Sequence, residues 1–271
     1  MIFTGIYLFS DIDGTLGLQE KGIPLRNVSA ISRFVENGGS FSLCTGRMAV
    51  SIKNFTKDIV VNGPCITNNG AAFYDYPTGK SYNVRTLPSK ISEYLKVIMK
   101  TEELLEVTAV TRSGYFRIMN ADGFYMPNDE DLNRRLFKLS KVHTPQLRVV
   151  FNLPSDVDIK SKVSLWNSWD FPGVDFIQSS GSYIEMMPKG VNKGSAFIKM
   201  CETQGIPVNR TFFIGDSYND IEMFKVAGFS ACVSETPAEL QGLCNCILGS
   251  CMDGALADFI HLLETKSLRI A

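Results

Sequence analysis

The feature that constrains this chain most is a short apolar run that ends in two aspartates. Residues 6–9 predict a buried strand, and Ser10-Asp11-Ile12-Asp13-Gly14-Thr15-Leu16 follows it at once. An aspartate at the carboxyl end of a parallel strand lies where open α/β sheets bind ligands, and Gly14 lets the backbone turn close to what is bound. The alternative is a solvated turn after an edge strand, because Asp and Gly are common turn formers.

Alternating strands and helices on both sides of a middle region predict an α/β protein with a doubly wound parallel sheet, that is, a Rossmann-like core. In the first part we expect strands at 6–9, 40–44 and 58–61, helices at 26–37 and around Val50–Phe55, and short strand-like pieces at 72–76 and 82–86. In the last part we expect helices at 193–204 and 255–263, another helix that passes through Met223, Phe224 and Val226, and strands at 211–214, 230–233 and 246–248.

The middle region has a different pattern, which predicts an inserted α+β cap domain. We expect helices at 89–100 and 157–169, strands at 105–111, 115–119, 146–152, 174–178 and 183–187, and a polar stretch at 128–141. The predicted domains are therefore 1–81 (core, first part), 82–187 (cap) and 188–271 (core, second part). Phe124-Tyr125-Met126, which follows Gly123, is the expected specificity loop of the cap.

Composition narrows the classes of partner. The chain has 271 residues, a formal net charge of −1 and 45% hydrophobic residues, and no basic stripe favours a nucleic acid or a membrane surface. A small polar ligand is the expected partner; the oligomeric state is not set by the sequence. Seven cysteines, an odd number in a chain of this size, indicate a reducing, cytoplasmic location. The spacing of Cys244 and Cys246 does not favour a soft-metal site.

Four polar groups stand at predicted strand ends or helix starts, and the carboxyl ends of neighbouring parallel strands meet at one edge of a sheet. Carboxylates gathered without histidine favour Mg²⁺, and a carboxylate can attack phosphorus as a nucleophile. Because like charges repel by roughly 1–4 kcal/mol at about 4 Å, a carboxylate that meets a phosphate needs cations beside it. The four groups are Asp11 with Asp13, Thr45-Gly46, Lys193, and Asp216 with Asn219 and Asp220. Singly, Lys193 or Thr45-Gly46 could be an ordinary helix start.

These residues resemble the four ordered motifs of the haloacid dehalogenase-like superfamily. The motifs are Asp11-Ile12-Asp13-Gly14-Thr15-Leu16, Thr45-Gly46-Arg47, Lys193-Gly194 and Gly215-Asp216-Ser217-Tyr218-Asn219-Asp220. The insert between the second and third motifs, with Asn69-Gly70-Ala71 before it, is similar to the large-cap branch of Cof-type sugar-phosphate phosphatases. Cys44 before Thr45, and Val233-Ser234-Glu235-Thr236-Pro237 in the late loop, depart from the usual pattern.

The resemblance implies a role for each motif. Asp11 would be the nucleophile that becomes phosphorylated, and Asp13 would protonate the leaving alcohol and then activate water. The metal would be held by the Asp11 carboxylate, the Asp13 backbone carbonyl and Asp216, with Asp220 as a supporting acidic group. The phosphate would be held by Thr45, Lys193, Asn219 and the amides of Ile12 and Gly46; Arg47 would contact the substrate or cap a helix.

The expected function is a cytoplasmic, Mg²⁺-dependent phosphatase for small phosphomonoesters, acting through an aspartyl-phosphate, with the cap closing over the leaving group. One alternative is a phosphomutase or phosphotransferase, which would use Asp11 and Asp13 but pass the phosphoryl group to a second hydroxyl. The other is a non-enzymatic phospho-sensor, which Asp13 and the large insert disfavour. We expect His143 and His261 to lie in a loop and on a helix face, without a catalytic role.

Overall fold

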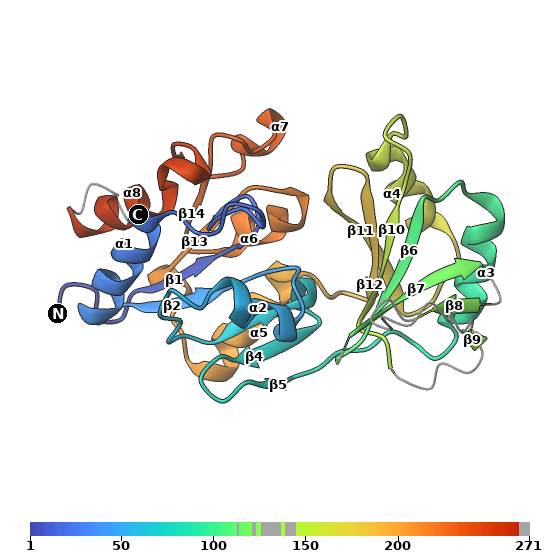
Figure 1. Cartoon of the computed structure of the whole chain (residues 1–271), viewed down its shortest axis with the longest axis horizontal. Coiled ribbons are helices and arrows are strands. Elements are labelled where there is room, and N and C mark those ends of the chain that lie inside the picture. The colour runs from blue at the N-terminus through green and yellow to red at the C-terminus, as the bar shows by residue number, and fades with distance from the viewer. Residues whose placement is uncertain (113, 121–122, 126–136, 139–144, 266–271) are drawn as a thin grey trace. The chain divides into compact units, whose positions relative to one another are not determined.

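The computed structural model describes residues 1–112, 114–120, 123–125, 137–138 and 145–265 (Figure 1). The chain divides into two compact units, each with its own sheet and core. The first comprises Met1–Asn83 and Asn192–Ala271, and the second comprises Val84–Val191.

The first unit is built on a five-stranded parallel sheet. Its strand order is β15-β14-β13-β1-β2, and every neighbouring pair is parallel. β1 therefore has a hydrogen-bonded neighbour on each side, so the solvated-turn alternative for an edge strand is wrong. The strands are β1 (Tyr7–Ser10), β2 (Ser40–Leu43), β13 (Thr211–Gly215), β14 (Phe229–Cys232) and β15 (Cys246–Ile247).

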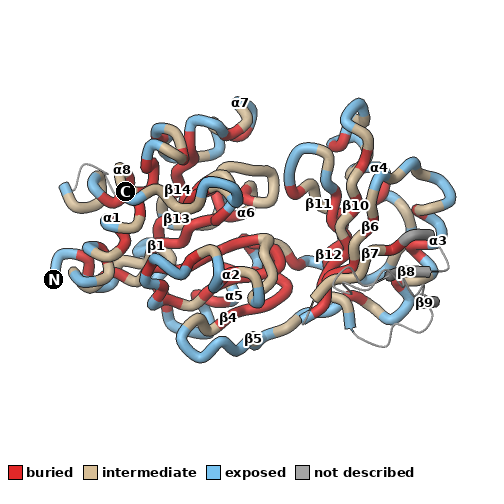
Figure 2. Tube along the Cα trace, viewed as in Figure 1, coloured by how far each residue is buried: buried red, intermediate tan, exposed pale blue. Residues whose placement is uncertain are grey.

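Helices cover both faces of this sheet, because alternate side chains of each strand point to opposite faces. Leu8 packs into a cluster with α1 and α8, whereas Phe9 packs into a second cluster with α5 and α6. Of the strands between these layers, β1, β2, β13 and β14 are mostly buried (Figure 2), whereas Ile247 of β15 is exposed. The helices are α1 (Leu25–Glu36), α2 (Ala49–Phe55), α5 (Lys193–Gln204), α6 (Ile221–Val226), α7 (Ala238–Gln241) and α8 (Ala255–Glu264). The predicted doubly wound α/β fold is confirmed.

The predicted third strand at 58–61 is wrong. Ile59 and Val61 are buried, but no strand forms there. The Asn62 side chain takes the place of a pairing strand: its Oδ1 accepts from the Phe41 N–H at 2.7 Å and its Nδ2 donates to the Gly39 carbonyl at 3.0 Å. The apolar pattern predicted burial correctly, while the side-chain hydrogen bonds decided the backbone.

The next strands form a small antiparallel sheet of their own. Its order is β3 (Cys65–Thr67), β4 (Ala72–Asp75) and β5 (Lys80–Tyr82), so the strand-like piece expected at 82–86 ends where it was predicted to begin. Between β3 and β4 the chain makes a tight 3-10 turn, η1 (Asn68–Gly70), in which all three residues have positive φ.

The second unit is a seven-stranded sheet with two helices packed on one face. Every strand pairs antiparallel with its neighbours, in the order β11-β12-β10-β6-β7-β8-β9. Trp166 of α4 is completely buried in its core. The elements are β6 (Glu106–Val110), β7 (Tyr115–Asn120), β8 (Gly123–Tyr125), β9 (Phe137–Lys138), β10 (Arg148–Asn152), β11 (Val174–Ser180), β12 (Tyr183–Pro188), α3 (Ile91–Thr101) and α4 (Ile159–Ser168).

Two predictions for this unit change. Phe124 and Tyr125 belong to β8 and pair with β7, so they are part of a strand and not of a loop; Met126 lies outside the described residues. Of the polar stretch at 128–141, only Phe137 and Lys138 are described, as β9. His143 also lies outside the described residues. Among the helices that the structure describes, none is long and apolar enough to cross a bilayer.

We expect the Asn62→Ala variant to be less stable by about 1–3 kcal/mol, because it loses both hydrogen bonds to the β2 edge. Urea unfolding followed by circular dichroism measures the change. Asn54→Ala is the control, since Asn54 is exposed on α2 and its loss should change stability by less than about 0.5 kcal/mol. Equal effects of the two substitutions would contradict the role given to Asn62.

Candidate active site

The residues that directly follow β13, β1 and β2, three neighbouring strands of the parallel sheet, lie at the same edge of the sheet. The ladder continues one residue past β1, since the Asp11 N–H donates to the Ile214 carbonyl at 2.9 Å and the Cys44 N–H donates to the Ser10 carbonyl at 2.8 Å. Asp11 therefore lies between the residues that follow β13 and β2. This register brings together groups that are about 200 residues apart in the chain.

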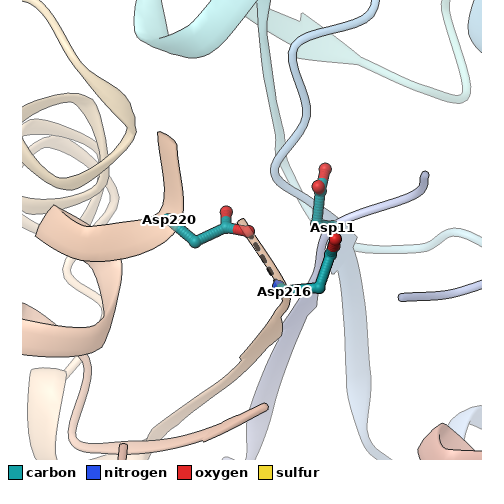
Figure 3. A group of neighbouring side chains, drawn as sticks. All are labelled: Asp11, Asp216 and Asp220. Carbon is teal, nitrogen blue, oxygen red and sulfur yellow. Dashed lines mark hydrogen bonds between the residues drawn. The ribbon is translucent and has the colours of Figure 1, made fainter. Parts of the chain in front are cut away.

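Asp11, Asp216 and Asp220 form a carboxylate cluster (Figure 3). One carboxylate oxygen from each lies within 4.8 Å of the others. Asp11 and Asp220 are buried, and Asp216 is partly exposed. Three carboxylates at this spacing repel one another unless positive charge lies among them.

Lys193 supplies one positive charge to the carboxylate cluster. Its Nζ lies 3.1 Å from Asp11 Oδ1 and donates to Asp220 Oδ1 at 2.7 Å, and the side chain is fully buried. Lys193 is the first residue of α5, which Asn192 caps by accepting from the Ser195 N–H at 2.8 Å. A Cβ on Gly194 would lie 2.6 Å from the Glu222 carbonyl, so glycine there lets α5 approach α6 and brings Lys193 to Asp220.

Asp220 holds the loop after β13 in place. Its Oδ2 accepts from the Asp216 N–H at 3.0 Å, drawn dashed in Figure 3, and from the Ser217 N–H at 3.1 Å. Its Oδ1 is engaged by Lys193. Asp220 therefore links the lysine to the backbone that carries Asp216.

The acidic and basic groups shift one another's pKa. Burial raises the pKa of Asp11 to about 7, although Lys193 and a hydrogen bond from the Ile12 N–H act in the opposite direction. Burial, together with the charges of Asp11 and Asp220, also raises the pKa of Asp216 well above its usual range. Burial by itself would lower the pKa of Lys193, but Asp11 and Asp220 outweigh it and raise that pKa.

The donors in the carboxylate cluster fit a hard divalent cation. All are carboxylate oxygens, and three ionised aspartates with one lysine carry a net charge of −2. Thr15 Oγ1 donates to Asp216 Oδ1 at 2.6 Å and so orients that carboxylate. Gly14, at φ +84°, passes so close to Asp216 that a Cβ there would lie 2.5 Å from Oδ2.

Thr45, Gly46 and Asn219 lie beside the loop that follows β3. Thr45 is fully buried, and its Oγ1 accepts from the Arg47 N–H at 3.1 Å. Asn219 Nδ2 donates to Asn69 Oδ1 at 3.0 Å, and a Cβ on Gly46 would lie 3.1 Å from the same oxygen. Asn69 therefore connects the second and fourth motifs, with a left-handed backbone at φ 52°.

Asp13 stands apart from the carboxylate cluster. Its side chain is 51% exposed and accepts two hydrogen bonds from Arg47, from Nε at 2.7 Å and from Nη2 at 2.6 Å. Arg47 Nη2 also donates to Gln19. Of the two expected roles for Arg47, substrate contact or helix cap, neither describes this ion pair.

Three residues that were not predicted from the sequence also belong to the site: Thr15, Gln19 and Asn69. Thr15 lies two residues after Asp13 in the first motif, and Asn69 lies in the Asn69-Gly70-Ala71 segment before the insert. Their positions in these segments were therefore a usable signal. Gln19 has no such signal, because only the folding of the loop brings it to Arg47. His261 lies on α8, with its side chain 66% exposed.

A doubly wound sheet with clustered carboxylates, a buried lysine and a buried threonine at one edge defines a class of hydrolase and phosphoryl-transfer enzymes. The family model described as haloacid dehalogenase-like hydrolase matches residues 8–260. The chain therefore belongs to the haloacid dehalogenase-like hydrolase family. The prediction of this family, and of an enzyme, is confirmed.

Curated relatives in this family are named as phosphatases. The chain is 23% identical over 252 residues to a putative phosphatase of Haemophilus influenzae, with 92% of this chain and 95% of the relative covered. It is 26% identical over 292 residues to the 5-amino-6-(5-phospho-D-ribitylamino)uracil phosphatase of Bacillus subtilis, with 93% and 96% covered. Both alignments span nearly the full length of each protein.

A solved structure confirms the fold. A protein from Streptococcus mutans has a TM-score of 0.80 and 14% sequence identity, covering 96% of this chain and 98% of its own. The likeness spans both units of the chain, and it concerns the fold alone.

We expect the stability of the cation-free protein to fall as the pH rises from about 4 to about 7. Within this window the folded chain retains the Asp11 proton, since its pKa is raised from 3.8 to about 7, and the unfolded chain does not. A fixed Mg²⁺ concentration, about a hundred times the Kd at pH 8, should raise the unfolding midpoint by about 5 °C at pH 8. The same concentration should raise it much less at pH 5, where a protonated Asp11 weakens Mg²⁺ binding. Thermal scans with Mg²⁺ or EDTA test this; equal shifts at both pH values would contradict it.

We expect Gly14→Ala to raise the Mg²⁺ concentration for half-maximal stabilisation by about tenfold, because the new Cβ displaces the Asp216 carboxylate, at a cost on the order of 1–3 kcal/mol. Gly22→Ala is the matched control: Gly22 also has a positive φ, of +74°, but a Cβ there meets nothing within 4 Å. Both variants carry backbone strain, so only a difference between them in Mg²⁺ titration supports this cause.

Proposed function

We propose that this chain is a Mg²⁺-dependent phosphatase that hydrolyses small phosphomonoesters through an aspartyl-phosphate on Asp11. The observation that carries the proposal is the buried Asp11 carboxylate at the end of β1, within 3.1 Å of the Lys193 ammonium and clustered with Asp216. Burial keeps water from the nucleophile, and the lysine offsets the repulsion between the carboxylate and an anionic substrate.

In the first half-reaction an Asp11 carboxylate oxygen attacks phosphorus. The bond from phosphorus to the ester oxygen breaks, and that oxygen takes a proton from Asp13 as the alcohol leaves. The exposure of Asp13 accords with this task, because the leaving group must reach the carboxyl from outside the buried cluster.

In the second half-reaction water attacks the phosphorus of the aspartyl-phosphate. Asp13, now a carboxylate, takes the proton of that water, and the bond between phosphorus and the Asp11 oxygen breaks. Inorganic phosphate leaves, and both aspartates return to their starting states. The two aspartates therefore have different tasks: Asp11 forms the covalent bond, and Asp13 transfers the proton.

The phosphate oxygens would be held by Thr45, Lys193, Asn219 and the amides of Ile12 and Gly46. Thr45 Oγ1 already accepts from the Arg47 N–H, which leaves its hydroxyl proton to donate to phosphate. Asn219 uses one amide proton on Asn69 and has a second to donate.

A bound Mg²⁺ would be held by the carboxylates of Asp11 and Asp216 and the backbone carbonyl of Asp13, and would neutralise charge on the transferring phosphoryl group. Asp220 would act as a positioning residue, because its oxygens already accept from Lys193 and two backbone N–H groups.

Small phosphorylated metabolites are the proposed substrates. Relatives named pyridoxal phosphate phosphatase and phosphoglycolate phosphatase, 22% and 27% identical, support this class. Seven free thiols accord with the proposed cytoplasmic location. A screen of sugar, sugar-alcohol, flavin and pyridoxal phosphates with Mg²⁺, measuring released inorganic phosphate, identifies the substrate. Transfer to a second sugar without release of phosphate would favour the phosphotransferase alternative.

We expect Asp11→Asn to lower phosphate release by about 10⁴-fold or more and to abolish labelling of the acid-quenched protein by a radioactive substrate, because the nucleophile is lost. Asp13→Asn should lower turnover by about 10²–10⁴-fold while the protein still forms some phosphoenzyme. Asp58→Asn, an exposed position away from the cluster, is the control and should retain full activity. Phosphoenzyme on Asp11→Asn would contradict the mechanism.

A further inference from the structure

The ion pair between Arg47 and Asp13 has a consequence for the reaction. An aspartate side chain that is 51% exposed can occupy several rotamers, and proton transfer requires one of them. Two parallel hydrogen bonds from one guanidinium fix both oxygens of the carboxylate at once. A single positive charge nearby would not fix its orientation.

Arg47 is itself held from several sides. Its Nη2 also donates to Gln19 Oε1, and its guanidinium carbon lies 4.3 Å from the centre of the Phe55 ring. Its backbone N–H donates to Thr45 Oγ1, and its carbonyl accepts from the Asn68 N–H at 3.0 Å. The Arg47 side chain is only 13% exposed. The guanidinium is therefore a rigid support and not a mobile surface charge.

We propose that Arg47 is a positioning residue, which orients the Asp13 carboxyl for proton transfer rather than gripping the phosphate. The inference rests on the proposed function, in which Asp13 is the general acid and base. When one Asp13 oxygen carries the proton on the side away from Arg47, that oxygen keeps a lone pair, so both oxygens can still accept from the guanidinium and the orientation persists. In the first half-reaction that proton goes to the leaving oxygen; in the second, Asp13 takes one from water.

The leaving group distinguishes this role from phosphate binding. An alkoxide that leaves from a sugar phosphate needs a proton, whereas the phenolate that leaves from 2,4-dinitrophenyl phosphate does not. The value of kcat/KM covers the steps up to departure of the leaving group, whereas kcat also includes attack by water. A residue that acts through Asp13 therefore affects kcat/KM for the sugar phosphate selectively.

The experiment compares Arg47→Gln and Arg47→Lys with the unchanged chain on glucose 6-phosphate, or the best sugar phosphate found, and on 2,4-dinitrophenyl phosphate. We expect kcat/KM to fall by about 10²-fold for the sugar phosphate and by less than about fivefold for the dinitrophenyl ester. We expect kcat to fall for both, since water attack needs Asp13. Lysine keeps the charge but not the two parallel hydrogen bonds, so it should not restore the rate.

A double-mutant cycle with Asp13→Asn tests whether Arg47 acts through Asp13. The Asp13→Asn/Arg47→Gln variant should lose no more kcat/KM on the sugar phosphate than Asp13→Asn by itself. Arg26→Gln is the matched control, because it removes an exposed arginine that pairs with Asp258 at 2.6 Å. It should leave kcat/KM unchanged for both substrates. Thermal unfolding midpoints confirm that each variant is folded.

Three outcomes would overturn the inference: equal losses of kcat/KM on both substrates, full rescue by lysine, or additive losses in the cycle. The first would indicate that Arg47 binds phosphate directly. If Asp13→Asn shows no preference for the better leaving group, the proposed role of Asp13 fails. If Asp13→Asn shows that preference and Arg47→Gln does not, only the role of Arg47 fails.

Discussion

The buried ammonium of Lys193 is the interaction on which the site depends. It lies between Asp11 and Asp220, and it is the cation that, among the residues described, forms ion pairs with this group of three carboxylates. Even with it the carboxylate cluster carries a charge of −2 when ionised. Burial is the main cause of the raised pKa of Asp11 and of Asp216, and repulsion between the carboxylates adds to it. The net negative charge of the site can therefore be reduced in two ways, by binding a divalent cation or by protonating a carboxylate.

The parallel sheet brings these side chains together without straining the backbone that carries them. Each strand ends at the same edge, so the residues after β1, β13 and β2 meet without unusual backbone at Asp11 or Thr45. Positive φ occurs in the supporting loops instead, at Gly14, where glycine adopts it without strain, and at Asn69. Gly194 allows the close approach of α5 to α6 on which the reach of Lys193 depends.

The site separates into a buried and an exposed part, and the proposed chemistry uses the difference. Asp11 is held by Lys193 inside the protein, where its negative charge is costly and its oxygen is shielded from water. Asp13 is held by Arg47 near the surface, where protons and leaving groups can reach it. Two aspartates in one short loop thus differ in environment more than their spacing suggests.

The sequence by itself determined the alternation of strands and helices and the order of the motifs, and these were enough to predict the doubly wound fold and the family. They could be predicted because the hydrophobic period and the glycines at strand ends are local properties of the sequence. It predicted burial at 58–61 but not the backbone, which Asn62 decided through hydrogen bonds to Phe41 and Gly39. It could name Arg47 but not its partner. Only the tertiary structure brought Arg47 to Asp13 and Gln19, and Thr15 to Asp216, since these contacts depend on how separate loops close on one another.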